Sequence, residues 1–412
     1  MSDTENRKLF VCYIPGADLR RLNPANAPYM AGLLQSYPMM VFTRGFPTTE
    51  TLSTIITGAR PNEHGVWQAT LRSDGQLSWM DRVMDALPDP LTTTVQCVLY
   101  QLGRFGEMPT IPPRRRRRLE FRRVKFRGSA DTSEMLTKVG DVESVFRIIG
   151  ATECSYRFSD QFHARARLLQ EAVSGTHKLE ILQFHGLDVL SHWRLDNEQA
   201  VRQYYRLTDA FVRELHEKCQ ARGVTMVLSS DHGQETVRGT VDLRRALRGS
   251  GVPEDEYTVF IEVMMARFWF HSPAAREALT RVLSKTPHGR VAAFEEFGRY
   301  RMDLADGRYG EVFFLMDPGY TIFPHDFYHP VVNCYFGLKD WQQRRRAHNP
   351  RHYAYHGYAT VCDAEKGFMT VLDHRYRTDG QEHELIDMAP SLLGLLGYPK
   401  PASMSGHPRF HR

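Results

Sequence analysis

The sequence contains few cysteines and no long hydrophobic run. Its six cysteines are spread singly over 412 residues, and no two of them form a Cys-x-x-Cys pair. This usage argues against a disulfide framework and predicts reduced thiols in a protein core. A membrane-spanning helix needs about 18 or more apolar residues in succession, and no such run occurs. Because the first residues are polar and lead directly into an apolar run, we expect a soluble, unexported, cytoplasmic protein with no membrane partner.

The sequence also lacks visible repeats and any strong excess of charge. No repeat with a period of about 20 to 50 residues is found, so a solenoid is not expected. The hydrophobic share of 42% and the charged share of 25% are ordinary for a globular protein, and the net charge of +5 is modest. We expect one large α/β domain over residues 1–412, with a central, mostly parallel sheet flanked by helices.

One buried strand ends in a pair of polar residues. The segment 224–230 is apolar and β-branched, and it is followed at once by Asp231-His232-Gly233. In open α/β sheets, ligands bind beyond the carboxyl ends of the strands. A carboxylate beside an imidazole suits a zinc-type metal, although a lone Asp-His-Gly is more often a polar turn.

A second strand has a similar ending. Residues 179–184 read as a strand, and Asp188 and His192 follow it four residues apart. If a helical turn begins there, both side chains lie on one side and are able to share one metal. A long amphipathic pattern over 198–222 connects this strand to the central one, which makes a βαβ unit. Further strands are expected at 9–14, 39–42 and 93–99.

A hydroxyl-rich loop precedes the helix expected over 50–57. Thr48 or Thr49 is suited to cap this helix, and capping is the commoner role of such a residue. The same hydroxyl is also suited to be a nucleophile, because the backbone N–H groups of a first helical turn bind phosphate.

Two insertions are expected in the main sheet. Nine of the sixteen residues in 112–127 are basic, so we predict a basic insertion over 103–132 that forms a lid or an anion-binding surface. A solvated charge run and a nucleic-acid contact are the alternatives. Residues 250–345 lose the simple alternation of strands and helices and predict a smaller α+β subdomain. Beyond it, His356 lies in a third histidine-containing turn.

Taken together, these motifs resemble the alkaline phosphatase superfamily, and within it the type I phosphodiesterase/nucleotide pyrophosphatase branch. The resemblance rests on motifs in one order, namely Pro-Thr-Thr-Glu-Thr with Thr57-Gly58-Ala-Arg-Pro-Asn-Glu-His-Gly65, Asp188-x-x-x-His192, Ser230-Asp-His-Gly233, His356-Gly-Tyr and Ile386-Asp-Met-Ala-Pro-Ser-Leu-Leu. It spans most of the chain and leaves the arginine insertion and much of 240–345 without a diagnostic motif.

The resemblance implies a centre with two divalent metals, usually Zn²⁺, with Mn²⁺ or Ca²⁺ as alternatives. Asp188, His192 and His356 would hold one metal, and Asp231 and His232 the other. Thr48 lies ten residues before Gly58, as the family's nucleophile does, while Thr49 and Thr51 are close enough to keep this assignment open. The substrate-binding residues expected in addition are Thr51, Arg114, Arg115 and Arg116.

The chain departs from the family pattern at two positions. The family places a metal-binding Asp directly after its first strand, where this chain has Pro15, and proline is no ligand. Asp18 is the nearby carboxylate that could replace it. The nucleotide pyrophosphatase branch often has an Asn three residues after the nucleophile, where this chain has Thr51.

These observations favour a metal-dependent phosphodiesterase or pyrophosphatase that acts on a small phosphorylated substrate, such as a nucleotide or another polyanion. Phosphomonoester or phosphonate hydrolysis on the same scaffold is an alternative, because a fold does not fix its chemistry. A ligand-binding pseudo-enzyme is the alternative outside enzymes, and Pro15 motivates it. A sulfatase is disfavoured because no cysteine lies near Thr48.

Overall fold

The computed structural model divides the chain into two compact units. It describes residues 7–45, 47–68, 70–72, 79, 83, 86–102, 119–121, 138–159, 169, 173–292, 294–299, 307–339, 351–359, 362–379 and 383–412. The first unit comprises residues 1–67, 123–234 and 361–412, and the second comprises 68–122 and 235–360. Within the described residues, no helix has the length and apolar character needed to cross a membrane.

A seven-stranded sheet forms the centre of the first unit. Its strands, in spatial order, are β20 (His383–Glu384), β2 (Met39–Thr43), β18 (Lys366–Val371), β9 (Thr225–Ser230), β1 (Leu9–Tyr13), β8 (Leu179–Phe184) and β7 (Cys154–Ser159). Strands β9, β1, β8 and β7 run parallel, whereas β18 is antiparallel to both of its neighbours. The predicted α/β fold with a central, mostly parallel sheet is therefore confirmed, and the antiparallel β18 makes the sheet mixed.

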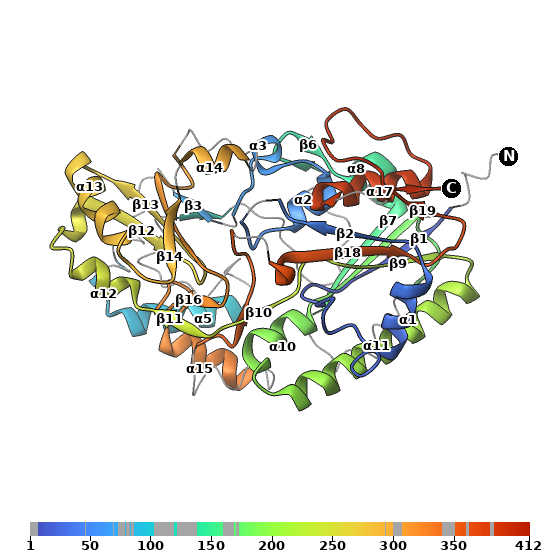
Figure 1. The fold of residues 1–412 in the computed structure, drawn as a ribbon, viewed down its shortest axis with the longest axis horizontal. Coiled ribbons are helices and arrows are strands. Elements are labelled where there is room, and N and C mark those ends of the chain that lie inside the picture. Colours follow the sequence, from blue (N-terminus) through green and yellow to red (C-terminus); the bar gives the residue numbers. More distant parts are fainter. Residues whose placement is uncertain are drawn as a thin grey trace. The chain divides into compact units, whose positions relative to one another are not determined.

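The strands in the middle of this sheet are buried on both faces because helices cover each side (Figure 1). On one face lie α1 (Pro28–Ser36) and α11 (Glu198–Ala221), and on the other lie α2 (Leu52–Thr57), α8 (Val145–Ile149) and α17 (Met388–Leu396). Alternate residues of β1 serve the two sides. Leu9, Val11 and Tyr13 join the hydrophobic core that includes α17. Burial and, to a smaller extent, Cys219 of α11 raise the pKa of the Cys12 thiol. This alternation explains the continuous apolar run that predicts the strand.

The second unit contains a four-stranded antiparallel sheet. Its spatial order is β12 (Tyr257–Ile261), β13 (Met265–Phe270), β15 (Val312–Met316) and β14 (Gly289–Ala292). Helix α13 (Pro273–Leu283) begins at Ser272, whose hydroxyl accepts from the backbone N–H of Ala275 as an N-cap. This part of the chain therefore contains both antiparallel strands and a helix.

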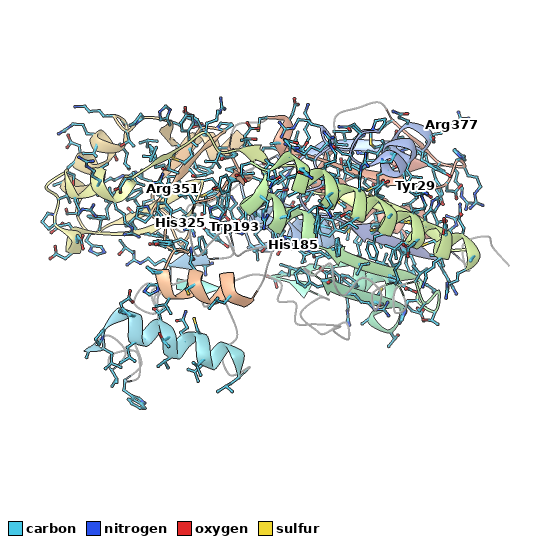
Figure 2. All side chains as sticks on the ribbon, turned by 90° about the horizontal axis from the view of Figure 1, so that it is seen from below. Tyr29, His185, Trp193, His325, Arg351 and Arg377 are labelled. Carbon is cyan, nitrogen blue, oxygen red and sulfur yellow. The ribbon has the colours of Figure 1, made fainter. Side chains whose placement is uncertain are left out.

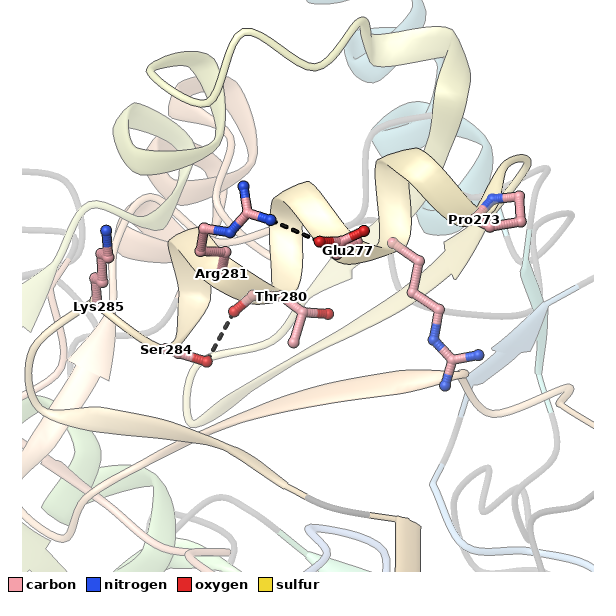
Figure 3. A pocket seen from close by; sticks show the side chains of 7 residues that line it. Pro273, Glu277, Thr280, Arg281, Ser284 and Lys285 are labelled. Atoms are coloured by element: carbon pink, nitrogen blue, oxygen red, sulfur yellow. Dashed lines mark hydrogen bonds and ion pairs between the residues drawn. The ribbon is translucent and has the colours of Figure 1, made fainter.

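A shallow depression of about 540 Å³ follows the outer side of α13 (Figure 3). Its charged residues Glu277 and Arg281 pair with each other at 2.7 Å, one helical turn apart. The hydroxyl of Ser284 donates to the carbonyl oxygen of Thr280. All the residues that line the depression, Arg276 and Lys285 included, lie in α13 or directly after it, so no second element supplies a convergent set of groups for a ligand.

One predicted element is wrong. Residues 93–99 lie in helix α5 (Asp89–Gln101), not in a strand. The run of threonine and valine has high β-propensity, but Leu91, Val95 and Val98 recur at helical spacing on an exposed stripe. Thr93 and Cys97 lie on the buried side of the helix. The helical spacing of the apolar residues is therefore a better guide to the local structure than the β-propensity of the threonines and valines.

Candidate functional site

Three parallel strands of the first unit end beside one another and lead into polar turns. The register pairs Tyr13 of β1 with Gln183 of β8 and with Ser229 of β9, so the carboxyl ends of the three strands lie at one edge. Gly16 has a φ of +72°, and a Cβ there would lie 2.9 Å from Cα of Asp188. The turn after β1 therefore packs directly against the turn after β8. This is the edge of the sheet, beyond the carboxyl ends of the strands, at which open α/β sheets bind ligands.

Asp188 and His192 lie on helix α10 (Gly186–Arg194), directly after β8. Their four-residue spacing places them on one side of the helix, and Nε2 of His192 lies 3.5 Å from Oδ1 of Asp188. His185 contacts the other carboxylate oxygen through its Nε2 at 2.8 Å. Figure 2 labels His185 and Trp193, which lie near the two ends of this helix.

These histidines keep the carboxylate of Asp188 charged. Burial favours its neutral form, but the neighbouring His192 and His185 outweigh burial and hold the pKa of Asp188 well below its ordinary value. Gln234 also donates from its side-chain Nε2 to Oδ1 of Asp188. Asp188 is thus a buried anion that is held by donors on several sides, which is the state that a metal ligand requires.

Asp231 and His232 follow β9 and are both buried. Nε2 of His232 lies 3.4 Å from Oδ2 of Asp231, and a ligand atom of His232 lies within 4.8 Å of one of Asp188. Burial lowers the pKa of His232, so the imidazole is neutral. Its Nδ1 is 2.8 Å from the carbonyl oxygen of Gly233, and donation to that oxygen places the lone pair on Nε2.

The threonines before α2 differ sharply in their surroundings. Thr48 is fully buried, and its hydroxyl donates to the carbonyl oxygen of Trp67 at 2.6 Å. The same oxygen accepts from the backbone N–H of Glu50 at 2.8 Å. Thr51 instead donates its hydroxyl to Oδ2 of Asp231 at 2.6 Å. Thr49 is exposed.

The first turn offers no obvious carboxylate in place of the family's aspartate. Pro15 lies at the expected position, and the carboxylate of Asp18 is occupied by Arg20, whose Nη2 lies 2.7 Å from Oδ2. The backbone N–H of Gln234 donates to the same oxygen at 3.2 Å. Asp18 is therefore part of a structural ion pair that joins the turn after β1 to the turn after β9.

Arg44 and Gln234 belong to this part of the unit, and no motif in the sequence indicated either of them. Arg44 is buried, pairs with Glu365, and donates from Nη1 to the carbonyl oxygen of Thr48. Burial lowers the pKa of Arg44 to about 10, while Asp231 is the strongest of the charges that oppose this shift. Arg44 consequently remains a cation at neutral pH. Its position directly after β2, at the same edge of the sheet, was the available sequence clue.

The remaining predicted residues lie outside the first unit or outside the described residues. His356 belongs to the second unit, where it follows the short strand β17 (Ala354–Tyr355). The arginines Arg114, Arg115 and Arg116, like most of the predicted basic insertion, lie outside the described residues.

The donor set of the first unit fits a divalent metal. The imidazole of His192 lies 3.5 Å from the carboxylate of Asp188, and a ligand atom of His232 lies within 4.8 Å of one of Asp188. Carboxylate and imidazole are ligands that zinc prefers. Oδ1 of Asp231 is buried and has no hydrogen-bond partner among the described residues, so a cation could satisfy it. The fit is weaker for a second metal, because Pro15 supplies no ligand and Asp18 is paired with Arg20.

Comparison with solved structures shows a shared fold. Murine ectonucleotide pyrophosphatase/phosphodiesterase 5 matches with a TM-score of 0.64 at 13% identity, covering 96% of each chain. The human protein of the same name matches with a TM-score of 0.58, again at 13% identity and 96% of each chain. An inactive form of the murine protein in complex with AMP matches with the same values as the human one. At this identity, the likeness concerns the fold alone.

Comparison of sequences supplies the family. No curated protein matches the chain. The sequence profile described as Type I phosphodiesterase / nucleotide pyrophosphatase matches residues 42–335, which include Thr48, Asp188, His192, Asp231 and His232. This match extends over more than half of the chain. The protein therefore belongs to the type I phosphodiesterase/nucleotide pyrophosphatase family of the alkaline phosphatase superfamily.

Proposed function

We propose that the protein is a metal-dependent hydrolase of phosphoesters, of the phosphodiesterase or nucleotide pyrophosphatase type, with a threonine nucleophile. One observation carries this proposal. A threonine hydroxyl from the loop before α2 donates to Asp231 at 2.6 Å, beside a neutral imidazole and close to a second buried carboxylate. A hydroxyl held against an acidic group in a set of metal-binding side chains is suited to attack phosphorus.

The carboxylates and imidazoles of the site are the groups that would bind divalent metals. Asp188 and His192 would hold one divalent metal. Asp231 and His232 would hold a second metal. Zn²⁺ is proposed because carboxylate and imidazole are its usual ligands, with Mn²⁺ and Ca²⁺ as alternatives to test. When bound, such metals polarise a phosphoryl oxygen and neutralise developing negative charge.

The chain's own residues supply the rest of the chemistry. His185 and Gln234 orient the carboxylate of Asp188, since each contacts one of its oxygens. Arg44 donates to the carbonyl oxygen of Thr48 and so fixes the loop that contains the threonines. Its buried cation also raises the positive potential near Asp231, which favours a phosphate anion.

The proposed substrate is a small phosphorylated compound, and a nucleotide is the first candidate. The support is the family itself, together with the structure of a protein of similar fold in complex with AMP. In this proposal, the arginines of the basic insertion, Arg114, Arg115 and Arg116, help to attract the anion.

The test uses purified protein loaded in turn with Zn²⁺, Mn²⁺ and Ca²⁺. The substrates are p-nitrophenyl monoesters and diesters, nucleotides with a pyrophosphate bond, and a sulfate ester. We expect metal-dependent turnover of a phosphodiester or pyrophosphate and none of the sulfate ester. The variant Asp188→Asn is the control, because it preserves shape but removes a charged ligand. Nucleotide binding without turnover under every metal would instead support the pseudo-enzyme, and faster turnover of monoesters would change the reaction class.

A further inference from the structure

The loop before α2 contains three threonines that could supply a nucleophile, and the structure distinguishes them. Spacing from Gly58 favours Thr48. A nucleophile, however, must be accessible to substrate and must lie beside the groups that activate it. Thr49 is exposed, whereas Thr48 and Thr51 are both buried, and their hydroxyls face different partners.

The hydroxyl of Thr48 is fully used by the loop itself. It donates to the carbonyl oxygen of Trp67 at 2.6 Å and accepts from the backbone N–H of Glu50 at 2.8 Å. The residue has no exposed surface, and its backbone carbonyl is held by Arg44. The carbonyl oxygen of Glu50 is a further, longer acceptor for this hydroxyl at 3.3 Å, and Thr48 would have to break these hydrogen bonds to attack a substrate. These contacts are those of a turn-forming threonine.

The hydroxyl of Thr51 faces the candidate metal ligands. It donates to Oδ2 of Asp231 at 2.6 Å, and the same carboxylate oxygen lies 3.4 Å from Nε2 of His232. Thr51 retains 6% of its surface, unlike Thr48. The oxygen atom that already lies against the acidic cluster is therefore the one on Thr51.

We propose that Thr51 is the nucleophile and that the hydroxyl of Thr48 belongs to the turn that presents it. This inference rests on the proposed phosphoester hydrolysis and assigns the nucleophile to a different residue from the one that spacing favours. It also gives Thr51 a different role from the substrate contact that the family comparison implies for this position.

The covalent step balances with groups that the site contains. A bond forms between Oγ1 of Thr51 and phosphorus, while the bond from phosphorus to the leaving-group oxygen breaks. The leaving group departs with that electron pair, and the hydroxyl proton follows the existing hydrogen bond to Oδ2 of Asp231. Water then attacks phosphorus and the bond to Oγ1 breaks. Oγ1 regains its proton from Asp231, and the water proton passes to solvent.

Trapping the covalent intermediate tests the assignment directly. The Zn²⁺-loaded protein is mixed with bis(p-nitrophenyl) phosphate, quenched in acid and digested. Fragmentation mass spectrometry of the peptide that contains residues 48–51 then locates the added phosphoryl group. We expect it on Thr51. A modification on Thr48 or Thr49 would overturn the proposal.

Variants give a second, independent measure. Thr51→Ala should lower kcat by about 10³-fold or more and abolish the trapped adduct. Thr51→Ser retains a hydroxyl and should keep measurable turnover and a measurable adduct. Thr48→Ala should keep the adduct on Thr51 and lose less than about tenfold in kcat, and exposed Thr49→Ala is the matched control. Thermal melting must show that each variant is folded.

The outcomes separate the two proposals. A wild-type protein that turns over phosphoesters while Thr51→Ala remains active and Thr48→Ala does not would overturn the assignment to Thr51 alone. A folded, metal-loaded wild-type protein that hydrolyses no phosphoester and traps no adduct would overturn the proposed function and this assignment with it.

Discussion

The carboxylate of Asp18 is clasped by the guanidinium of Arg20, with Nε 3.0 Å from Oδ1 and Nη2 2.7 Å from Oδ2. Two backbone N–H groups, those of Arg20 and Gln234, add to these contacts at 2.9 and 3.2 Å. A charge-assisted, two-point pair of this kind is among the stronger hydrogen-bonded contacts in proteins. A metal at Asp18 would have to displace Arg20.

We therefore expect Asp18→Asn to leave the number of bound metals unchanged and to lower stability. The loss should be about 1 kcal/mol, because the half-exposed guanidinium of Arg20 and the backbone N–H of Gln234 lose a charged acceptor. Metal analysis after gel filtration and chemical denaturation measure the two effects. Asp209→Asn is the matched control, since Asp209 is also buried and accepts from the backbone N–H groups of Tyr29 and Met30. A decrease of about one metal per chain in Asp18→Asn alone would show that Asp18 is a ligand.

Asp188→Asn and His192→Ala should each remove metal and activity without unfolding the protein. Both residues lie on α10 beyond the end of β8, outside the hydrophobic core. His185→Gln should have a smaller effect, weakening metal affinity by about 10- to 100-fold, because His185 touches Asp188 and acts through it. Isothermal titration with Zn²⁺ and circular dichroism distinguish these effects. Full metal affinity in Asp188→Asn would remove Asp188 from the site.

His64 should make the fold sensitive to acid. Its ring is buried, with Nδ1 accepting from the backbone N–H of Val66 at 3.2 Å and Nε2 3.1 Å from the hydroxyl of Thr54. Burial lowers the pKa of His64 to about 3, whereas the unfolded chain has the ordinary value of about 6.5. Below about pH 6.5 the unfolded state therefore binds a proton that the folded state rejects.

The contribution of His64 to the free energy of unfolding is thus fully present above about pH 6.5 and is lost progressively as the pH falls towards 3. The expected slope is about 1 kcal/mol per pH unit. His64→Gln should be less stable at pH 7 but should show a shallower decline between pH 6 and 4. Urea unfolding at each pH measures both proteins. Equal slopes for the two would mean that His64 is not the buried, neutral group that the structure shows.

The sequence predicted where the strands of the central sheet end, but it did not predict which partners the side chains at those ends contact. A buried strand followed by Asp231 and His232 is a local pattern, so the parallel sheet and its crevice could be inferred from it. The direction of the Thr48 and Thr51 hydroxyls depends on a turn closed by Trp67, nineteen residues after Thr48. Spacing carries no information about such a contact. The ion pair of Asp18 with Arg20 likewise depends on the conformation of the turn and could not be inferred from the sequence.

Helix α5 shows a different limit. Its threonines and valines favour a strand locally, and the expectation of a strand over 93–99 followed from them. The apolar stripe of Leu91, Val95 and Val98 is exposed in the structure, so the usual association of helical periodicity with burial does not apply here.

The basic insertion should affect recognition and not the chemical step. Residues 112–127 contain nine basic side chains, and such a density of like charge attracts phosphates over a distance of about 10 Å at moderate salt. Replacing Arg114 to Arg118 by Gln should raise KM for a nucleotide with several negative charges and flatten its dependence on salt. The kcat for bis(p-nitrophenyl) phosphate, which carries one negative charge, should remain within about twofold of the wild type. Steady-state kinetics between low and moderate salt measure both quantities. If KM for the nucleotide and its salt dependence are the same in the variant and the wild type, the arginines form a solvated loop that has no part in recognition.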